Sequence, residues 1–289
     1  MRAALAALGL SIYFGGACAE AIRVLDDTGA EVVLRAPARR VVTLAPHLTE
    51  LVNAAGGAAS LVAADSASDY PSAVSDLPRI GDASGLDLER IVALRPDLVL
   101  GWQSGNKPSD IARLRQLGLP IFLSEPRRLD DVARTLRMLG VMLGTASVAE
   151  QRAEAFEARL RTLRARAAGL RPVSVFFEVW HQPLMTVNAD HLISDVVALC
   201  GGYNALGALP ALAPAVSLES VLAQDPEVIF AAGLPAGALA SWGRFSGLRA
   251  VQRHQIFEIH SDSLTRATPR ALDGAEQLCR RLEAAREPT

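Results

Sequence analysis

Several aromatic and imidazole side chains directly follow apolar runs that are predicted strands, where they could contact a ligand. Trp102 is the clearest case, because it comes straight after Gly101 at the end of such a run. A flat indole there suits a large planar or apolar ligand, although it can also simply cover a sheet edge. Ligands of open α/β sheets bind beyond the carboxyl ends of the strands, so we expect a binding site there. The other residues at predicted strand ends are His47, Ser68–Tyr70, Trp180, His181 and the segment 261–266.

His47 and His181 occupy similar positions in the two halves of the chain, which raises the question of a metal site. Two imidazoles without a suitably spaced acidic residue are too few for a free transition-metal ion, so we expect no resident metal. One of them could be the axial ligand of a metal held in a macrocycle, or each could simply belong to a turn or helix start. The motifs G-x-S-x-G, G-x-G-x-x-G after a strand, the P-loop and H-E-x-x-H are all missing. We therefore predict a binding protein without catalytic residues.

The elements that position these residues occur twice. The segment Leu86–Leu100, LDLERIVALRPDLVL, returns as VSLESVLAQDPEVIF at Val216–Phe230, at a constant offset of 130 residues and without a gap. Each copy reads as a helix capped by Asp87 or Ser217, a tight turn with a proline, and a strand. Two related units in one chain predict two related lobes.

Glu89 and Glu219 are equivalent residues of the two copies. Each lies in the first turn of its predicted helix, where the helix dipole alone favours a carboxylate by about 0.3 to 1 kcal/mol. Their equivalence also places one exposed carboxylate on each lobe. That arrangement suits docking onto a two-fold symmetric partner that carries arginines.

Alternating strands and helices predict an α/β fold with two Rossmann-like lobes, whose mostly parallel sheets are joined by one long α-helix. We place the N-terminal lobe at 20–146, the connecting helix at 147–169 and the C-terminal lobe at 170–289. The helices expected at 46–57 and 191–202 resemble each other down to their final pair of glycines. The other elements expected are a hairpin at 22–34, strands at 40–44, 60–64, 120–123, 173–179 and 255–259, and a last helix at 270–285.

The connecting helix has its own signals. Ser147 and Glu150 fit a capping box, and Gly169 supplies a stop. Its length of around 21 residues corresponds to a rod of about 30 Å, which we expect to act as a stiff spacer that limits hinge motion. One helical face is marked by apolar residues at alternating steps of four and three, namely Ala149, Ala153, Phe156, Leu160, Leu163 and Ala167.

The first nineteen residues, MRAALAALGLSIYFGGACA, read as a secretory signal with a cleavage site after Ala19. A lipid anchor at Cys18 is not expected, because Gly15 stands where a lipobox has leucine. The formal net charge of −2 leaves no basic field for nucleic acid. We therefore expect an exported, periplasmic protein.

Cys200 and Cys279 gain meaning from export, since oxidising compartments favour disulfides. They could form a bridge or remain as two buried free thiols.

The chain resembles the cobalamin-binding proteins of ABC importers, which are helical-backbone (class III) substrate-binding proteins. The resemblance covers nearly the whole mature chain. It implies a periplasmic protein, monomeric when free, that captures cobalamin or another corrinoid between its lobes and delivers it to a two-fold pair of membrane subunits. Its most specific segments are SDYP (68–71), LERIVALRPDLVLGW (88–102) with Gly105-Asn106, LCGG followed by Asn204, and SDSLTRATPRALDGAEQLC (261–279).

The resemblance also assigns roles to residues. Trp102 matches a pocket tryptophan, and Asp262 and Arg266 match a ligand-contacting loop that here includes Ser263, Leu264 and Thr265. Glu89 and Glu219 match the carboxylates that dock on arginines of the membrane subunits, and Cys200 and Cys279 match a disulfide pair. The remaining expected ligand contacts are Ala67, Met185, Trp180, His181 and His47.

The chain departs from the family at four pocket positions. Ala67, Ala83, Met185 and Ala213 stand where the cobalamin binders have aromatic residues. This leaves an alternative within the fold, a haem or ferric-siderophore binder with His47 or His181 as a possible haem ligand.

Overall fold

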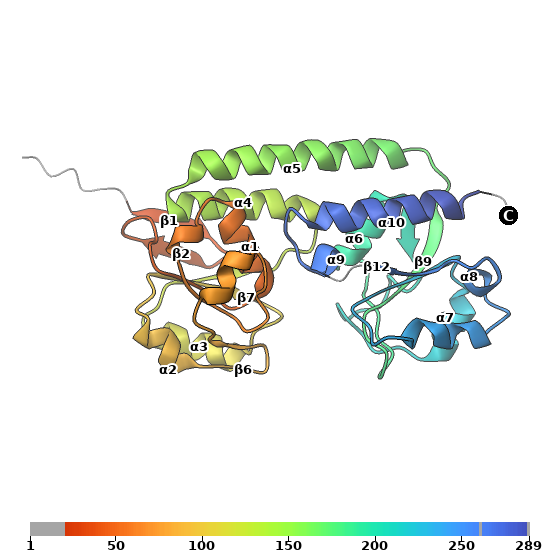
Figure 1. The fold of residues 1–289 in the computed structure, drawn as a ribbon, viewed down its shortest axis with the longest axis horizontal. Helices are drawn as coiled ribbons and strands as arrows, with labels where there is room; N and C mark the ends of the chain where they lie inside the picture. The colour runs from red at the N-terminus through yellow and green to blue at the C-terminus, as the bar shows by residue number, and fades with distance from the viewer. Residues whose placement is uncertain (1–20, 260–261, 288–289) are drawn as a thin grey trace, which may run out of the picture.

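The structure is a computed structural model that describes residues 21–259 and 262–287. Two α/β lobes lie side by side, and the long helix α5 (Ala146–Ala167) runs along both of them (Figure 1). No helix in these two ranges is long and apolar enough to cross a bilayer. The predicted secretory signal, with Cys18, lies outside the described residues.

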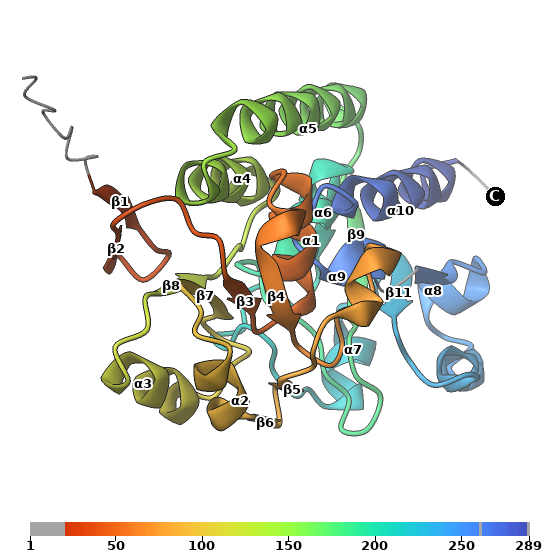
Figure 2. The ribbon, with the colours of Figure 1, turned by 60° about the vertical axis from the view of Figure 1, so that its left-hand side comes forward.

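The N-terminal lobe contains a parallel sheet in the order β4-β3-β7-β8. Successive residues of β7 point to opposite faces: Leu98 and Leu100 join one buried cluster, and Val99 joins another. Helices α1 and α4 cover the first face, and α2 and α3 cover the second (Figure 2). The strands are β3 (Val41–Thr43), β4 (Leu61–Ala64), β7 (Leu98–Trp102) and β8 (Ile121–Ser124), and the helices are α1 (Pro46–Ala54), α2 (Leu88–Ala93), α3 (Pro108–Gln116) and α4 (Leu129–Leu143).

Small elements complete this lobe. The predicted hairpin forms from the antiparallel strands β1 (Ile22–Leu25) and β2 (Glu31–Leu34). A second short antiparallel pair and two 3-10 turns flank the sheet, namely β5 (Gly81–Asp82), β6 (Gly85–Leu86), η1 (Ala58–Ser60) and η2 (Ser72–Asp76).

The C-terminal lobe repeats the plan with a parallel sheet in the order β10-β9-β11-β12. Helices α6 and α10 pack on one face, and α7, α8 and η3 pack on the other. Its elements are β9 (Val173–Glu178), α6 (Leu192–Leu199), β10 (Gly202–Asn204), α7 (Leu218–Gln224), β11 (Val228–Ala232), η3 (Ala238–Arg244), α8 (Arg249–Gln252), β12 (Ile256–Ile259), α9 (Asp262–Thr265) and α10 (Ala271–Ala285).

The two sheets have the same strand order, second-first-third-fourth in each lobe. The sequence repeat is also reproduced in detail. Asp87 and Ser217 cap α2 and α7 by accepting from the backbone nitrogen three residues on. The turn after each helix contains a residue with positive φ, Arg95 at 46° and Asp225 at 44°, again 130 residues apart. The predicted fold class is confirmed.

Helix α5 differs from its predicted start. It begins at Ala146, and its N-cap Thr145 makes no side-chain capping hydrogen bond, so the capping box of Ser147 and Glu150 is wrong. Glu150 instead accepts from Nε and Nη2 of Arg137 on α4. A bidentate ion pair with a guanidinium stabilises this carboxylate more than one hydrogen bond from a backbone amide does.

One buried cluster extends across both lobes. It includes Leu136 of α4, Phe156 of α5, Val196 of α6 and Leu278 of α10. A disulfide joins Cys200, at the end of α6, to Cys279 of α10, which settles the choice left open by the sequence. The lobes are thus held together by a shared core as well as by α5.

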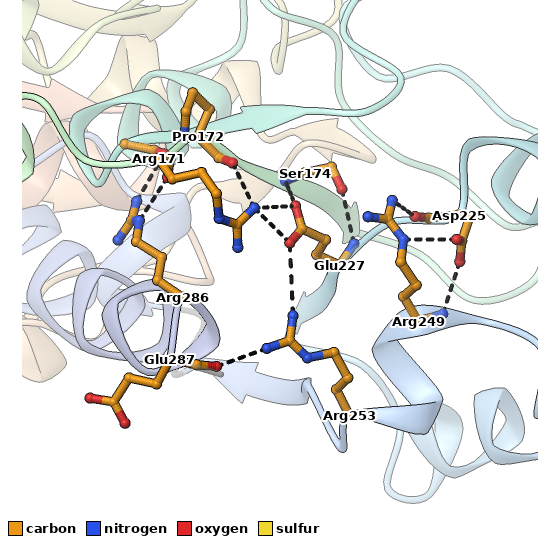
Figure 3. A network of polar contacts seen from close by, with 10 residues as sticks. Arg171, Pro172, Ser174, Asp225, Glu227, Arg249, Arg253, Arg286 and Glu287 are labelled. Atoms are coloured by element: carbon orange, nitrogen blue, oxygen red, sulfur yellow. Dashed lines mark hydrogen bonds and ion pairs between the residues drawn. The ribbon is translucent and has the colours of Figure 1, made fainter. Parts of the chain in front are cut away.

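The amino ends of the C-terminal strands are tied to the chain terminus by a polar network (Figure 3). The buried Glu227 carboxylate accepts from Arg171 Nη1 at 2.9 Å and from the backbone nitrogen of Ser174 at 3.2 Å. Arg286, just beyond α10, donates to the carbonyls of Arg171 and Cys200. This network faces away from the carboxyl ends of the strands, so we assign it to stability.

Candidate functional site

In the N-terminal lobe the strand order reverses between β3 and β7. Crevices at such switch points are the usual ligand sites of open α/β sheets. His47 lies at the start of α1, directly after β3, and Trp102 is the last residue of β7. Their rings meet edge to face, with centroids 5.4 Å apart and planes at 82°. The sequence therefore placed both residues at the correct end of the correct strands.

The loop after β7 holds Trp102 in place. Its backbone nitrogen donates to Asn106 Oδ1 at 2.7 Å, and Asn106 Nδ2 donates to the carbonyl of Leu44 on the neighbouring strand connection. Trp102 packs directly on Gly105, where an added Cβ would lie 1.9 Å from the indole. This contact explains the Gly105-Asn106 pair, and 37% of Trp102 remains exposed.

A cavity of about 250 Å³ lies between the lobes at this switch point. Thr265 and Arg266, from the segment predicted after the last strand, form part of its far wall. That segment was expected to be a loop, but residues 262–265 form the helical turn α9. The N-terminal lobe contributes Pro46, His47, Trp102, Ser104, Glu125, Pro126 and Arg127, and the C-terminal lobe contributes His191, Leu192, Leu212, Thr265, Arg266 and Ala267.

His191 is a cavity residue that our sequence interpretation did not select. It caps α6, where its Nδ1 accepts from the backbone nitrogen of Ile193 at 3.1 Å. Nδ1 is therefore unprotonated, and the neutral ring carries its proton on Nε2. The signal was present, because HLISDV at residue 191 repeats HLTELV at residue 47. In the N-terminal lobe, His47 follows the first strand and also begins the next helix. In the C-terminal lobe, His181 follows the first strand and His191 begins the helix.

Both cavity histidines are neutral at pH 7. Burial, reinforced by the nearby positive charge of Arg266, lowers the pKa of His47 to about 4. Burial alone lowers the pKa of His191 to about 4. His47 Nε2 is buried and has no hydrogen-bond partner, so an uncharged imidazole is the form that this site accepts.

We expect acid to destabilise the protein through His47. An unfolded histidine takes up a proton below pH 6.5, whereas folded His47 does so only near pH 4. The unfolded state therefore binds more protons in this window, and the contribution of His47 to the free energy of unfolding falls by about 3 kcal/mol between pH 7 and 4. Urea unfolding at several pH values should show that the free energy of unfolding falls less between pH 7 and 4 for His47→Gln than for the wild type. Equal losses would contradict the assignment.

Ion pairs join the lobes beside the cavity. Arg266 Nη1 donates to Glu50 Oε1 at 2.9 Å and to Asp69 Oδ1 at 2.5 Å. The hydrogen bond to Asp69, reinforced by the charge of Arg266, keeps the pKa of Asp69 below the ordinary value. Arg270 also reaches Glu50, at 3.3 Å, and lies over the ring of Tyr70 at 4.1 Å. Glu50, Asp69 and Tyr70 belong to the N-terminal lobe, so separating the lobes would break these contacts.

The other predicted ligand contacts occupy different places. Ser263 and Leu264 are the buried residues of α9, and Asp262 lies 3.5 Å from Arg266 in an ion pair. Ala67 is exposed on the N-terminal lobe. Trp180 and His181 line a second hollow at the end of β9, and Met185 donates its backbone nitrogen to the Trp180 carbonyl.

Residues 41–263 match the family model described as periplasmic binding protein. The chain belongs to this family. Its members are periplasmic, and the close relatives of this chain are substrate-binding proteins, so it is a binding protein and not an enzyme. Within the described residues no cluster of three or more histidine, cysteine or acidic side chains is placed to hold a metal ion.

The chain is similar to vitamin B12-binding proteins and to a heme-binding protein. The chain is 36% identical to the vitamin B12-binding protein of Vibrio cholerae over 252 residues, which cover 87% of this chain and 91% of that protein. It is also 36% identical to the vitamin B12-binding protein of Yersinia pestis over 255 residues, which cover 87% and 89%. The crystal structure of the Vibrio cholerae protein matches with a TM-score of 0.82 and 37% identity, covering 87% of this chain and 99% of that one. A periplasmic heme-binding protein from Roseiflexus matches with a TM-score of 0.75 and 25% identity, covering 86% and 100%.

Proposed function

We propose that this family member captures cobalamin or a related corrinoid in the cleft between its lobes and delivers it to the membrane subunits of an ABC importer. The observation that carries the proposal is the exposed Trp102 indole at the N-terminal switch point, opposite Arg266 and His191. An indole face provides apolar contact for a macrocycle, and Arg266 and the His191 Nε2–H supply donors for its polar side arms. The relatives from Vibrio cholerae and Yersinia pestis are vitamin B12-binding proteins.

The size of a corrinoid requires either that the lobes move apart or that the ligand extends beyond the cavity. A cavity of about 250 Å³ is below the 300 to 1,000 Å³ typical of sites for drug-sized ligands, and a corrinoid is larger than a drug. The ligand must therefore separate Arg266 from Glu50 and Asp69, or extend beyond the cavity. Ala67, Ala83 and Ala213 do not line the cavity, and each is exposed.

Trp102→Ala should weaken the binding of cyanocobalamin at least about tenfold, or about 1.4 kcal/mol, because it removes the apolar wall of the site. Tyr203→Ala is the matched control, since Tyr203 is an exposed aromatic residue on β10 outside the cavity. Its affinity should equal that of the wild type in titration calorimetry. Unchanged affinity of Trp102→Ala would remove this residue from the site.

Haem is the second candidate ligand. The structural match to a heme-binding protein and the neutral imidazoles at the cleft support it. A ferric siderophore is a third candidate: Arg127 and Arg266 could contact an anionic complex, whereas most of the cavity wall is apolar.

We further propose that the protein is a monomer when free and docks on a two-fold pair of membrane subunits through Glu89 and Glu219. Both side chains are exposed, and no ion pair holds either of them within the described residues. Helices α2 and α7 lie on the side of the lobes that faces away from α5 (Figure 1). The proposal also includes the domain boundaries predicted from the sequence, which are a signal at 1–19, lobes at 20–146 and 170–289, and a connecting helix at 147–169.

A further inference from the structure

The C-terminal lobe has a switch point of its own, between β9 and β11. A hollow of about 500 Å³ lies there, at the carboxyl ends of both strands. Trp180 and His181 come from the β9 end, and Gly233 comes from the β11 end. This hollow is the counterpart of the crevice between His47 and Trp102. The hollow is lined by Trp180, His181, Gln182, Gly233, Leu234 and Pro235.

A buried carboxylate orients His181. Glu178, the last residue of β9, is fully buried. Its Oε1 lies 2.7 Å from His181 Nδ1, and its Oε2 accepts from Trp242 Nε1 at 2.7 Å. An indole nitrogen can only donate, and a carboxylate can only accept, so His181 Nδ1 carries the proton. The neutral ring then presents an unprotonated Nε2.

This pairing is the one found behind metal-bound histidines. A carboxylate that accepts from one ring nitrogen fixes the ring and makes the other nitrogen more basic. The His181 side chain is 28% exposed, and no hydrogen bond to its Nε2 occurs within residues 21–259 and 262–287. Next to it, 58% of Trp180 is exposed, and its Nε1 donates to the carbonyl of Gln182 at 2.9 Å, which holds the indole at the hollow.

We propose that His181 Nε2 is an axial ligand for a metal-centred macrocycle whose axial position can exchange. A single protein nitrogen suffices, because the macrocycle supplies the other ligands. When the metal is the Co(III) of a corrinoid, the bond from cobalt to water breaks, the bond from cobalt to Nε2 forms and one water leaves, with no change of oxidation state. Glu178 is the positioning residue. This inference rests on the proposed function in that the cleft must admit such a macrocycle.

The test uses visible spectra of the purified full chain mixed with aquacobinamide, a corrinoid whose cobalt carries exchangeable water. The wild type should shift the absorption bands, because nitrogen replaces water on the cobalt. His181→Ala should abolish the shift and weaken binding at least about tenfold. Cyanocobalamin, whose cyanide does not exchange, should bind the wild type without such a shift.

The variant Glu178→Gln tests whether Glu178 positions the proton of His181 or only maintains the local structure. Its amide oxygen must face the donor Trp242 Nε1, so its NH₂ group must face His181 Nδ1. Nδ1 then becomes the acceptor, the proton moves to Nε2, and ligation is lost although His181 remains. His254→Asn is the control, because His254 is exposed and its φ of 53° suits asparagine. It should shift the spectrum as the wild type does, and circular dichroism should show that all variants are folded.

Each outcome is decisive. If aquacobinamide elutes with the wild type on gel filtration but its spectrum does not shift, His181 ligation is overturned while corrinoid binding stands. A different outcome is that no corrinoid binds, whereas haemin elutes with the protein and its spectrum shifts only when His181 is present. In that case the ligation by His181 stands and corrinoid capture fails. A shift retained in Glu178→Gln would overturn the positioning role. Binding of neither macrocycle would overturn both proposals.

Discussion

Replacing Glu89 and Glu219 together by alanine should abolish cobalamin uptake by the importer while leaving cobalamin affinity unchanged. Each carboxylate is exposed in the first turn of a short helix, one on each lobe. An arginine partner would gain charge-assisted hydrogen bonds at two separated points, and losing both removes the contacts that fix orientation. Uptake of labelled cobalamin by vesicles that contain the importer measures this.

The control variant carries Glu154→Ala and Glu287→Ala. It removes the same charge from exposed carboxylates on α5 and beyond α10, on the opposite side from α2 and α7 (Figure 1). Its uptake should match the wild type. Wild-type uptake by the Glu89 and Glu219 double variant would contradict the docking proposal.

Loss of the disulfide should be the largest single effect on stability. The bridge closes a sequence separation of 79 residues, for which the chain-entropy model gives about 4 to 5 kcal/mol. Cys200→Ala with Cys279→Ala should therefore lower the free energy of unfolding by about 4 kcal/mol. Guanidinium unfolding measures it, and the wild type with reductant should approach the variant.

Residual structure in the unfolded chain can reduce this effect, so a loss of 2 to 5 kcal/mol is the expected range for a native bridge. A loss below about 1 kcal/mol would show that noncovalent contacts, and not the bridge, hold α6 and α10 together. The network around Glu227 and Arg286 would then be the main tether of the chain terminus.

The sequence predicted what depends on local signals. Apolar runs predicted the strands. The helix caps, with a proline after each helix, indicated the repeat at Leu86–Leu100 and Val216–Phe230. Strand β10 was missed, because GYN is only three residues long and begins with the second glycine of a pair. The capping box of α5 failed because Arg137, distant in sequence, competes for Glu150.

Contacts between the lobes could not be read from the sequence. The pairing of Arg266 with Glu50 spans 216 residues, and no spacing rule connects them. Glu178 looked like an ordinary end of an apolar strand, although one of its oxygens contacts His181 and the other accepts from Trp242, 64 residues away. His191 could have been predicted, because the helix start HLISDV repeats HLTELV of the N-terminal lobe.

The duplication is more symmetric in its helices than in its ligand site. Both lobes keep an exposed glutamate at the same helix position. At the switch points, however, β7 ends in Trp102, whereas β11 leads into Gly233 without an aromatic residue. The C-terminal lobe instead places Trp180 after β9, so the two crevices offer their indoles from different strands.

The most direct test of corrinoid capture is a competition. The purified protein is mixed with equal amounts of cyanocobalamin and haemin, passed through gel filtration, and the protein peak is analysed by its visible spectrum. We predict that cyanocobalamin elutes with the protein at one molecule per chain and that haemin does not. A protein peak that carries haemin and no corrinoid would contradict the proposed function.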